Sequence, residues 1–289
     1  MHHSNPIQHS LPGQPKWHGL WPGAGLLTLA ILAATQPAAA QDSAKPPPEV
    51  RFAQAGDHRI AYRVSGEGPR VVVLVSGLGR GMDDFDRVLP ELGKFATVIT
   101  YDRPGYGRST PAARPADAEA ASADLAAVLQ QSGLKRPYLI VGHSLGGLYA
   151  ERYAAEHPRD VAGLVLEESR PSNFVQACTA AGSLPCAPTP EMVTKEPRGV
   201  RDEVAGLATT EAEVSQTLPA RVPVLVLSRT TPAKPSKFEA VWIESQAGLA
   251  RKYPGSAHLA APHSGHDIHK DDAEWFVAQV ARFACNLPE

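Results

Sequence analysis

The sequence is poor in cysteine, in net charge and in long apolar runs. It has three cysteines, and no two pairs of them stand at the spacing of a structural zinc site. The formal net charge is −2 and no stripe of lysine and arginine interleaved with aromatic residues occurs, so neither nucleic acid nor an anionic membrane surface is indicated as a partner. No Gly-x-Gly-x-x-Gly opens a helix after the first buried run, and no cofactor is implied. What remains is a near-neutral chain of ordinary composition.

The N-terminal segment differs from the rest of the chain. Lys16 is the only formally charged side chain within residues 1–40, and an apolar run at 24–34 is followed by small residues up to Ala40. This is the pattern of a secretory signal peptide, with cleavage expected after Ala40 and a linker over 41–49. The run is shorter than the roughly 20 residues that span a bilayer, although an uncleaved anchor or a buried helix is the alternative. We therefore expect an exported protein, periplasmic or secreted, without a stable membrane span after cleavage.

Two of the cysteines lie close together. Export would place Cys178 and Cys186 in an oxidising compartment, so we expect a disulfide between them. Cys285 is left over near Phe276 and Val280, on a predicted C-terminal helix. We expect it to be a buried, inert thiol.

Continuous apolar runs alternate with helical patterns along the chain. Runs without polar alternation are typical of strands that are covered on both faces, as in a parallel sheet. The runs cover residues 70–76, 96–101, 138–141, 161–166 and 222–227, and the helical patterns cover 83–93, 116–132, 146–156, 236–253 and 271–285. An antiparallel hairpin is expected before them, at 50–64. The alternation predicts an α/β protein with a mostly parallel, doubly wound sheet.

The alternation is interrupted between residues 169 and 220. This stretch is rich in Pro, Thr and Ala, contains two cysteines, and has no strand-like run. We interpret residues 169–220 as a small lid inserted between two strands, which commonly decides access and specificity. The core is then divided into a first part, 50–168, and a second part, 221–289.

A Gly-x-Ser-x-Gly motif at 142–146 directly follows one of the buried runs. Between a strand and a helix this motif predicts a nucleophilic serine, Ser144, on a tight and strained turn. The two glycines leave room for the neighbouring strand and helix to close over it. A helix that starts here would offer the Leu145 N–H to a developing oxyanion. The second oxyanion donor is expected to be the Leu78 N–H in the Ser-Gly-Leu-Gly loop at 76–79, for which an ordinary turn is the alternative.

Three histidines recur at every third residue near the C-terminal end. They are His263, His266 and His269. A metal cluster has to be considered, but the first two flank Ser-Gly, which indicates a loop rather than a helix, and no carboxylate-plus-histidine constellation occurs elsewhere. We therefore assign no metal. The expected order of serine, acid and then histidine makes this region the source of the general base.

Four motifs together resemble those of the α/β-hydrolase family. They are Ser76-Gly77-Leu78-Gly79, Tyr101-Asp102-Arg103-Pro104-Gly105-Tyr106-Gly107-Arg108-Ser109, Gly142-His143-Ser144-Leu145-Gly146 and Ser264-Gly265-His266-Asp267-Ile268-His269. The resemblance covers about residues 50–285. It implies the α/β-hydrolase fold and a Ser–acid–His triad in which His266 is the base, with His263 and His269 as lining or surface residues.

The acid departs from the commonest family pattern. The position after the run at 222–227 has no carboxylate, whereas the family's other position, after the preceding strand, carries Glu167 and Glu168. Successive strand side chains point to opposite faces, so only one of them can reach the histidine. When residues are counted forward from Gly163, Glu168 stands at the position of the triad acid in related sequences. When they are counted back from Arg170, Glu167 takes that position. We assign Glu168 and keep Glu167 as the alternative.

The resemblance implies a hydrolase that cleaves a small-molecule ester or lactone through an acyl-enzyme. The same fold hosts C–C hydrolases, haloperoxidases or perhydrolases, peptidases and non-catalytic binding proteins, which are the alternatives. Ser144 argues against dehalogenase and epoxide-hydrolase chemistry, for which the resemblance would require an aspartate at this position. Retention of the serine, the histidine and the oxyanion glycines argues against a binding protein.

Overall fold

A computed structural model describes residues 48–114 and 116–288. The predicted signal peptide at 1–40 and residues 41–47 of the predicted linker lie outside the described residues. No helix in the described part is both long enough and apolar enough to cross a membrane.

The core is an eight-stranded sheet in the order β1-β2-β4-β3-β5-β6-β7-β8. The strands are β1 Val50–Ala55, β2 His58–Ser65, β3 Arg70–Val75, β4 Ala96–Tyr101, β5 Tyr138–His143, β6 Val161–Glu167, β7 Val224–Arg229 and β8 Ala257–Ala261. β3 pairs in parallel with β4 and β5, and the parallel register continues through β6, β7 and β8. The predicted hairpin is confirmed, because β1 and β2 pair antiparallel and β2 joins the sheet antiparallel to β4.

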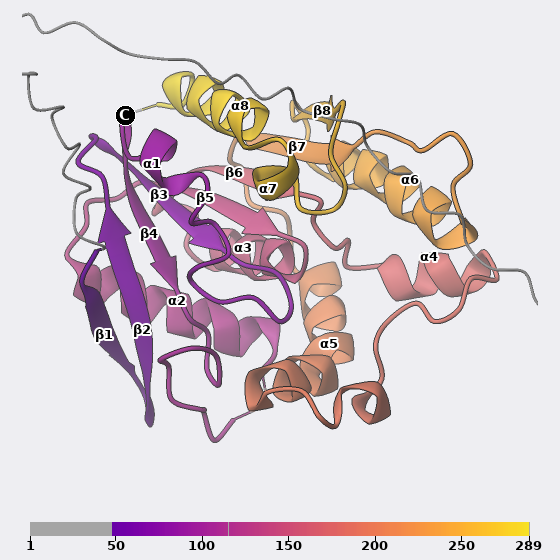
Figure 1. Ribbon diagram of the computed structural model, residues 1–289, viewed down its shortest axis with the longest axis horizontal. Helices are drawn as coiled ribbons and strands as arrows, with labels where there is room; N and C mark the ends of the chain where they lie inside the picture. Colours follow the sequence, from indigo (N-terminus) through magenta and orange to yellow (C-terminus); the bar gives the residue numbers. More distant parts are fainter. Residues whose placement is uncertain (1–47, 115, 289) are drawn as a thin grey trace, which may run out of the picture. The chain divides into compact units, whose positions relative to one another are not determined.

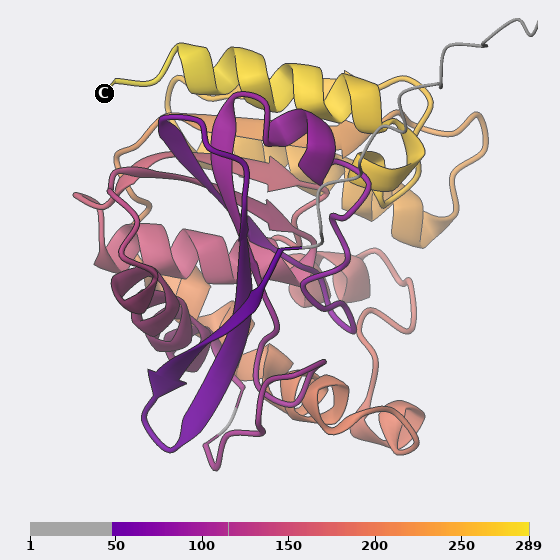
Figure 2. The same ribbon diagram turned by 60° about the vertical axis from the view of Figure 1, so that its left-hand side comes forward.

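Helices cover both faces of the sheet, as the alternating pattern predicts. They are α1 Leu89–Leu92, α2 Ala118–Ser132, α3 Leu145–Glu156, α6 Lys237–Lys252, α7 Ile268–Asp271 and α8 Ala273–Cys285. Leu125 of α2 and Leu148 of α3 pack with one face of β3 and β5, and Leu249 of α6 joins the same apolar cluster. Leu92 of α1 and Phe276 of α8 pack with the opposite face. Figures 1 and 2 show α8 and the pair α2 and α3 on opposite sides of the sheet.

The predicted lid, residues 169–220, is a mainly helical segment between β6 and β7, and we call it the inserted segment. It contains α4 Phe174–Ala180, the 3₁₀ helix η1 Pro190–Val193 and α5 Arg198–Gln216. α5 packs against α2 and α3, whereas α4 packs against α6 (Figure 1). The length of α5 was not predicted, because its sequence is polar on the solvent side and has few large apolar residues.

Two other expectations need correction, and one strand was missed. The helix predicted at 83–93 is a helix only over Leu89–Leu92, because residues 82–88 form successive turns with i to i+3 hydrogen bonds. β8 was not predicted, because it is a short edge strand in which four of the five residues are exposed and no apolar run marks it. Cys285 is exposed rather than buried. It follows the buried Ala284 by one residue, and about 100° of helical rotation carries it off the apolar stripe.

Candidate active site

Ser144 lies on the turn between β5 and α3, with φ +52° and ψ −120°. A non-glycine residue at positive φ is strained, and such strain is retained where the surrounding structure enforces it. The flanking glycines have the predicted steric role. A Cβ on Gly142 would lie 2.6 Å from the Gly147 Cα, and one on Gly146 would lie 2.2 Å from the Val75 carbonyl oxygen. The helix and the central strand therefore close directly over the serine.

The two predicted oxyanion residues lie beside Ser144. Leu145 is the first residue of α3, and Leu78 follows β3 in the loop at 76–79. A Cβ on Gly77 would lie 3.2 Å from the Ser144 Cβ, so this loop is packed directly against the serine. Leu78, Leu145 and Ser144 line one small cavity of about 60 Å³. The structure thus brings the three residues together around one space.

Glu168 faces His266. Its Oε2 atom lies 3.1 Å from the His266 Nδ1, and the carboxylate is fully buried. Two further donors hold it, the Trp242 Nε1 at 2.8 Å and the Arg229 backbone N–H at 2.8 Å. The Trp242 ring also packs edge-on against the imidazole, with ring centroids 5.3 Å apart. Because Nδ1 donates to the carboxylate, the imidazole is held in the tautomer that leaves Nε2 free to accept a proton.

Glu167 faces a different histidine. Its Oε1 atom accepts hydrogen bonds from the His269 backbone N–H at 2.7 Å and from the His269 Nδ1 at 2.8 Å. Both side chains are fully buried. The expectation that only one glutamate can reach His266 agrees with this geometry, whereas the placement of His269 as a lining or surface residue is wrong. His263 is exposed.

The Glu167–His269 pair belongs to a buried charged cluster with Asp84 and His143. The His269 Nε2 lies 3.6 Å from the Asp84 Oδ2, and the His143 ring packs edge-on against His269. Burial alone would lower the pKa of His269, but the charges of Glu167 and Asp84 and the hydrogen bond to Glu167 outweigh it and raise that pKa to about 9. Burial lowers the pKa of His143 to about 4. Near neutral pH the cluster therefore contains a charged His269 and a neutral His143.

This cluster lies directly behind the Ser144 turn and the His266 loop. The His143 Nε2 donates to the His266 carbonyl oxygen at 3.0 Å, and the Ser144 backbone N–H donates to the Glu167 carbonyl oxygen at 3.1 Å. Lys270 also forms an ion pair with Asp84. The chain segments that carry the serine and the histidine are thus connected through one buried network.

A second buried network joins the loop at 76–79 to the inserted segment. Arg103 donates to the carbonyl oxygens of Ser76 and Gly77, at 2.6 and 2.8 Å. Its Nε also lies 2.5 Å from the Glu203 Oε1 of α5, and the Tyr106 hydroxyl donates to the Glu203 Oε2 at 2.6 Å. Burial lowers the pKa of Arg103, but the charge of Glu203 outweighs this and raises it. The guanidinium is therefore charged and fixes the backbone beside Ser144.

Several residues of the site were not identified from the sequence. Arg103 lies within the Tyr101–Ser109 motif, so its position was available although its role was not. Trp242 and Glu203 come from α6 and α5, and no local pattern marks them. Their contacts form only when distant elements pack together. In the described part of the chain, no group of three or more His, Cys, Asp or Glu side chains is arranged to hold a metal ion.

The comparisons with known proteins agree with this architecture. A family model described as alpha/beta hydrolase fold matches residues 70–193. The uncharacterized protein YqjL of Bacillus subtilis is 24% identical over 72% of this chain and 80% of its own length. Several other curated relatives match over less than half of their own length.

Solved structures match over a larger share of the chain. Cfl2 from Burkholderia cenocepacia is similar with a TM-score of 0.64 and 17% identity, over 81% of this chain and 95% of that one. A thermophilic esterase from Thermogutta terrifontis is similar with a TM-score of 0.60 and 20% identity, over 81% of this chain and 97% of that one. Likeness at this identity concerns the fold. The chain therefore has the α/β-hydrolase fold.

Proposed function

We propose that this protein is a serine hydrolase that cleaves the carboxylic ester bond, open-chain or cyclic, of a small molecule. Ser144 is the nucleophile, His266 the general base and Glu168 the acid that orients it. The observation that carries the proposal is the buried Glu168 carboxylate held 3.1 Å from the His266 Nδ1, together with Ser144 at positive φ on a turn whose N–H donates to the Glu167 carbonyl oxygen. A base oriented by a carboxylate and a serine on a strained turn are parts that nucleophilic catalysis by serine requires.

The proposed reaction proceeds through an acyl-enzyme. The Ser144 Oγ attacks the acyl carbon while the His266 Nε2 takes its proton, and Glu168 stabilises the imidazolium that results. The tetrahedral oxyanion receives hydrogen bonds from the backbone N–H groups of Leu78 and Leu145. Collapse breaks the bond to the alcohol oxygen, which leaves with the proton from His266. A water molecule then gives a proton to His266 and attacks the acyl carbon, and collapse of this intermediate releases the carboxylic acid while His266 returns the proton to the Ser144 Oγ.

Two further observations support an ester substrate. The proposed nucleophile is a serine, so the covalent intermediate is an acyl ester that water can hydrolyse in the second half of the reaction. One similar structure is that of an esterase from Thermogutta terrifontis. The relation is at the level of the fold, and the substrate of this chain is part of the proposal.

We propose in addition that the protein is exported. The structure contains the predicted disulfide between Cys178 and Cys186, whose Cα atoms are 5.7 Å apart. Disulfides persist in oxidising compartments and are rare in reducing ones. The apolar run and small residues that predict a signal peptide, with cleavage after Ala40, are consistent with this location.

The direct test is turnover of activated esters by the wild-type protein and by Ser144→Ala. We expect turnover by the wild type and a loss on the order of a million-fold in the variant, because serine and histidine act as one unit. Circular dichroism should show an unchanged fold. Wild-type rates in the folded variant would overturn the assignment of the nucleophile.

A further inference from the structure

Two spaces meet at the inserted segment. The first is the cavity of about 60 Å³ beside Ser144, and the second is a groove of about 480 Å³ between α4 and α5. Both are lined by Pro188 and Leu207, and by no other residue in common. These two side chains therefore stand between the proposed nucleophile and a much larger space.

The cavity beside Ser144 is small for a substrate site. Ligand sites usually measure about 300–1,000 Å³. The space of about 60 Å³ is about a fifth of the lower end of that range. It therefore suits a short acyl group better than a long one.

The charges in the cavity wall are already compensated. Glu203 is paired with Arg103 at 2.5 Å, and Arg170 is paired with Glu211 at 2.6 Å. Neither wall residue offers an unpaired charge to a charged acyl group, and burying such a group without a partner is costly. The cavity therefore favours an uncharged acyl group.

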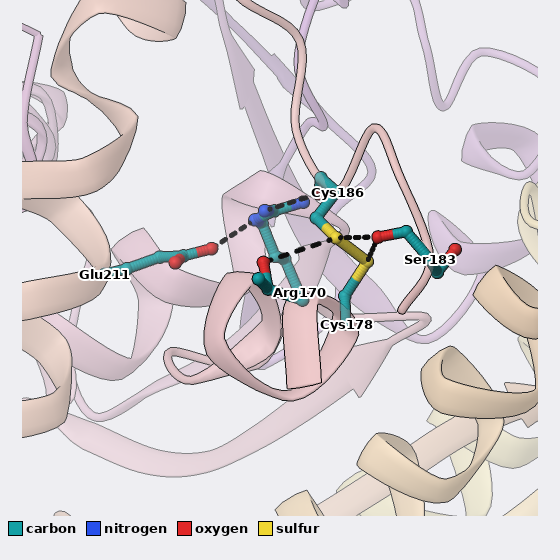
Figure 3. The surroundings of a disulfide bond; sticks show 6 residues. Arg170, Cys178, Ser183, Cys186 and Glu211 are labelled. Carbon is teal, nitrogen blue, oxygen red and sulfur yellow. Dashed lines mark hydrogen bonds and ion pairs between the residues drawn. A yellow bond between two sulfur atoms is a disulfide. The ribbon is translucent and has the colours of Figure 1, made fainter. Parts of the chain in front are cut away.

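The wall between the two spaces is held from several sides. Leu207 lies on α5 and is only 6% exposed. Pro188 follows Cys186 by two residues, and Cys186 is fixed by the disulfide to α4. The Arg170 Nη2 donates to the Cys186 carbonyl oxygen at 3.2 Å while its Nε pairs with Glu211 of α5 (Figure 3). Arg170 thus connects the disulfide loop to the helix that carries Leu207.

The histidine side of the site is more open. The His266 side chain is 38% exposed, whereas Glu168 behind it is fully buried. The alcohol leaves toward the histidine that protonates it. The alcohol part of an ester is therefore not confined by the wall that confines the acyl part.

We propose that Leu207 and Pro188 limit the acyl side of the site, so that the enzyme acts on esters of short, uncharged carboxylic acids. This inference rests on the proposed function, because it takes Ser144 as the nucleophile. Leu207 is then the residue that determines acyl length. Shortening it joins the cavity to the groove, where a longer chain finds apolar walls such as Val175 and Val204.

The test is a panel of 4-nitrophenyl esters from acetate to octanoate, with wild type and Leu207→Ala. In the wild type we expect kcat/KM to fall at least about tenfold between butanoate and hexanoate, since a misplaced methylene is worth about 10–200-fold. In Leu207→Ala the ratio of octanoate to acetate should rise at least about tenfold. Leu207→Val should give an octanoate-to-acetate ratio between those of the wild type and Leu207→Ala. This variant provides the test if Leu207→Ala does not fold.

Leu218→Ala is the matched control, because Leu218 lies in the same segment but is 86% exposed. Its length profile should equal that of the wild type. Equal wild-type turnover of octanoate and acetate would overturn the inference and leave the proposed function standing. An unchanged ratio in both Leu207 variants would overturn the role of Leu207. If no ester is turned over and fluorophosphonate does not label Ser144, the proposed function fails and the inference fails with it.

Discussion

At the scale of single residues, the site contains two adjacent glutamates that serve two different histidines. Glu168 holds His266 at 3.1 Å and Glu167 holds His269 at 2.8 Å, although both carboxylates are fully buried at the same end of β6. The positive φ of Glu168, +43°, turns its backbone just after the strand ends. Neighbouring residues of identical type can therefore have separate roles.

Glutamine substitutions should separate these roles. We expect Glu168→Gln to lower kcat on the order of 10³–10⁴-fold, as loss of a triad acid does, with little change in the fold. Glu167→Gln should keep kcat within about tenfold but lower the melting temperature, because it leaves a charged His269 buried without its partner. Steady-state kinetics and thermal unfolding check both. A larger loss of kcat in a folded Glu167→Gln would contradict the assignment.

The raised pKa of His269 predicts a pH dependence of stability. A histidine whose pKa is higher in the folded protein stabilises it fully below the unfolded value of about 6.5, and this stabilisation is lost as the pH rises through about 9. Between pH 6 and pH 10 the wild type should lose about 3 kcal/mol of unfolding free energy relative to His269→Gln. Urea unfolding of both proteins at each pH measures the difference. Parallel pH profiles would show that His269 does not carry the charge.

Much of the site could be predicted at this scale because its main residues lie in local motifs. Ser144, Leu145 and Leu78 follow strand ends, and strand ends are marked by apolar runs and glycines. The choice between Glu167 and Glu168 depended on how the strand was aligned with related sequences. The alternation of strand side chains shows that the two glutamates point to opposite faces, but it does not show which histidine each of them contacts. Glu203 and Trp242 could not be predicted, because their partners are about 100 and 74 residues away in the chain.

At the scale of elements, the inserted segment interrupts the alternation of strands and helices and borders the cavity beside Ser144. It supplies Arg170, Glu203 and Leu207 to the wall of the cavity. The core strands could be predicted because they are buried on both faces and read as continuous apolar runs. The 19-residue helix α5 and the edge strand β8 could not, since α5 owes its position to packing and β8 is mostly exposed.

The disulfide in this segment has a measurable effect. Replacement of Cys178 and Cys186 together by serine should lower the unfolding free energy by about 2.5 kcal/mol on the chain-entropy model, for a loop of this sequence separation of 8. Denaturant unfolding measures it. In unfolded protein under non-reducing conditions a single thiol, that of Cys285, should react with iodoacetamide. Intact mass decides this, and three alkylated thiols would refute the disulfide and weaken the case for export.

At the scale of the whole molecule, the fold collects the proposed catalytic residues at one edge of the sheet. Ser144 follows β5, Glu168 follows β6 and His266 follows β8, and these strands run in parallel. Ligands of open α/β sheets bind beyond the carboxyl ends of the strands. The order of the strands therefore brings residues that are far apart in sequence to one site, with the inserted segment bordering it.

The most direct measurement of the central claim is fluorophosphonate labelling followed by peptide mass spectrometry. A fluorophosphonate reacts with a serine that is activated by a neighbouring base, so labelling reports the chemistry without knowledge of the natural substrate. We predict one adduct, on the peptide that contains Ser144, which is lost in Ser144→Ala and strongly slowed in His266→Ala. Labelling at another serine, or no labelling of the folded wild-type protein, would contradict the account.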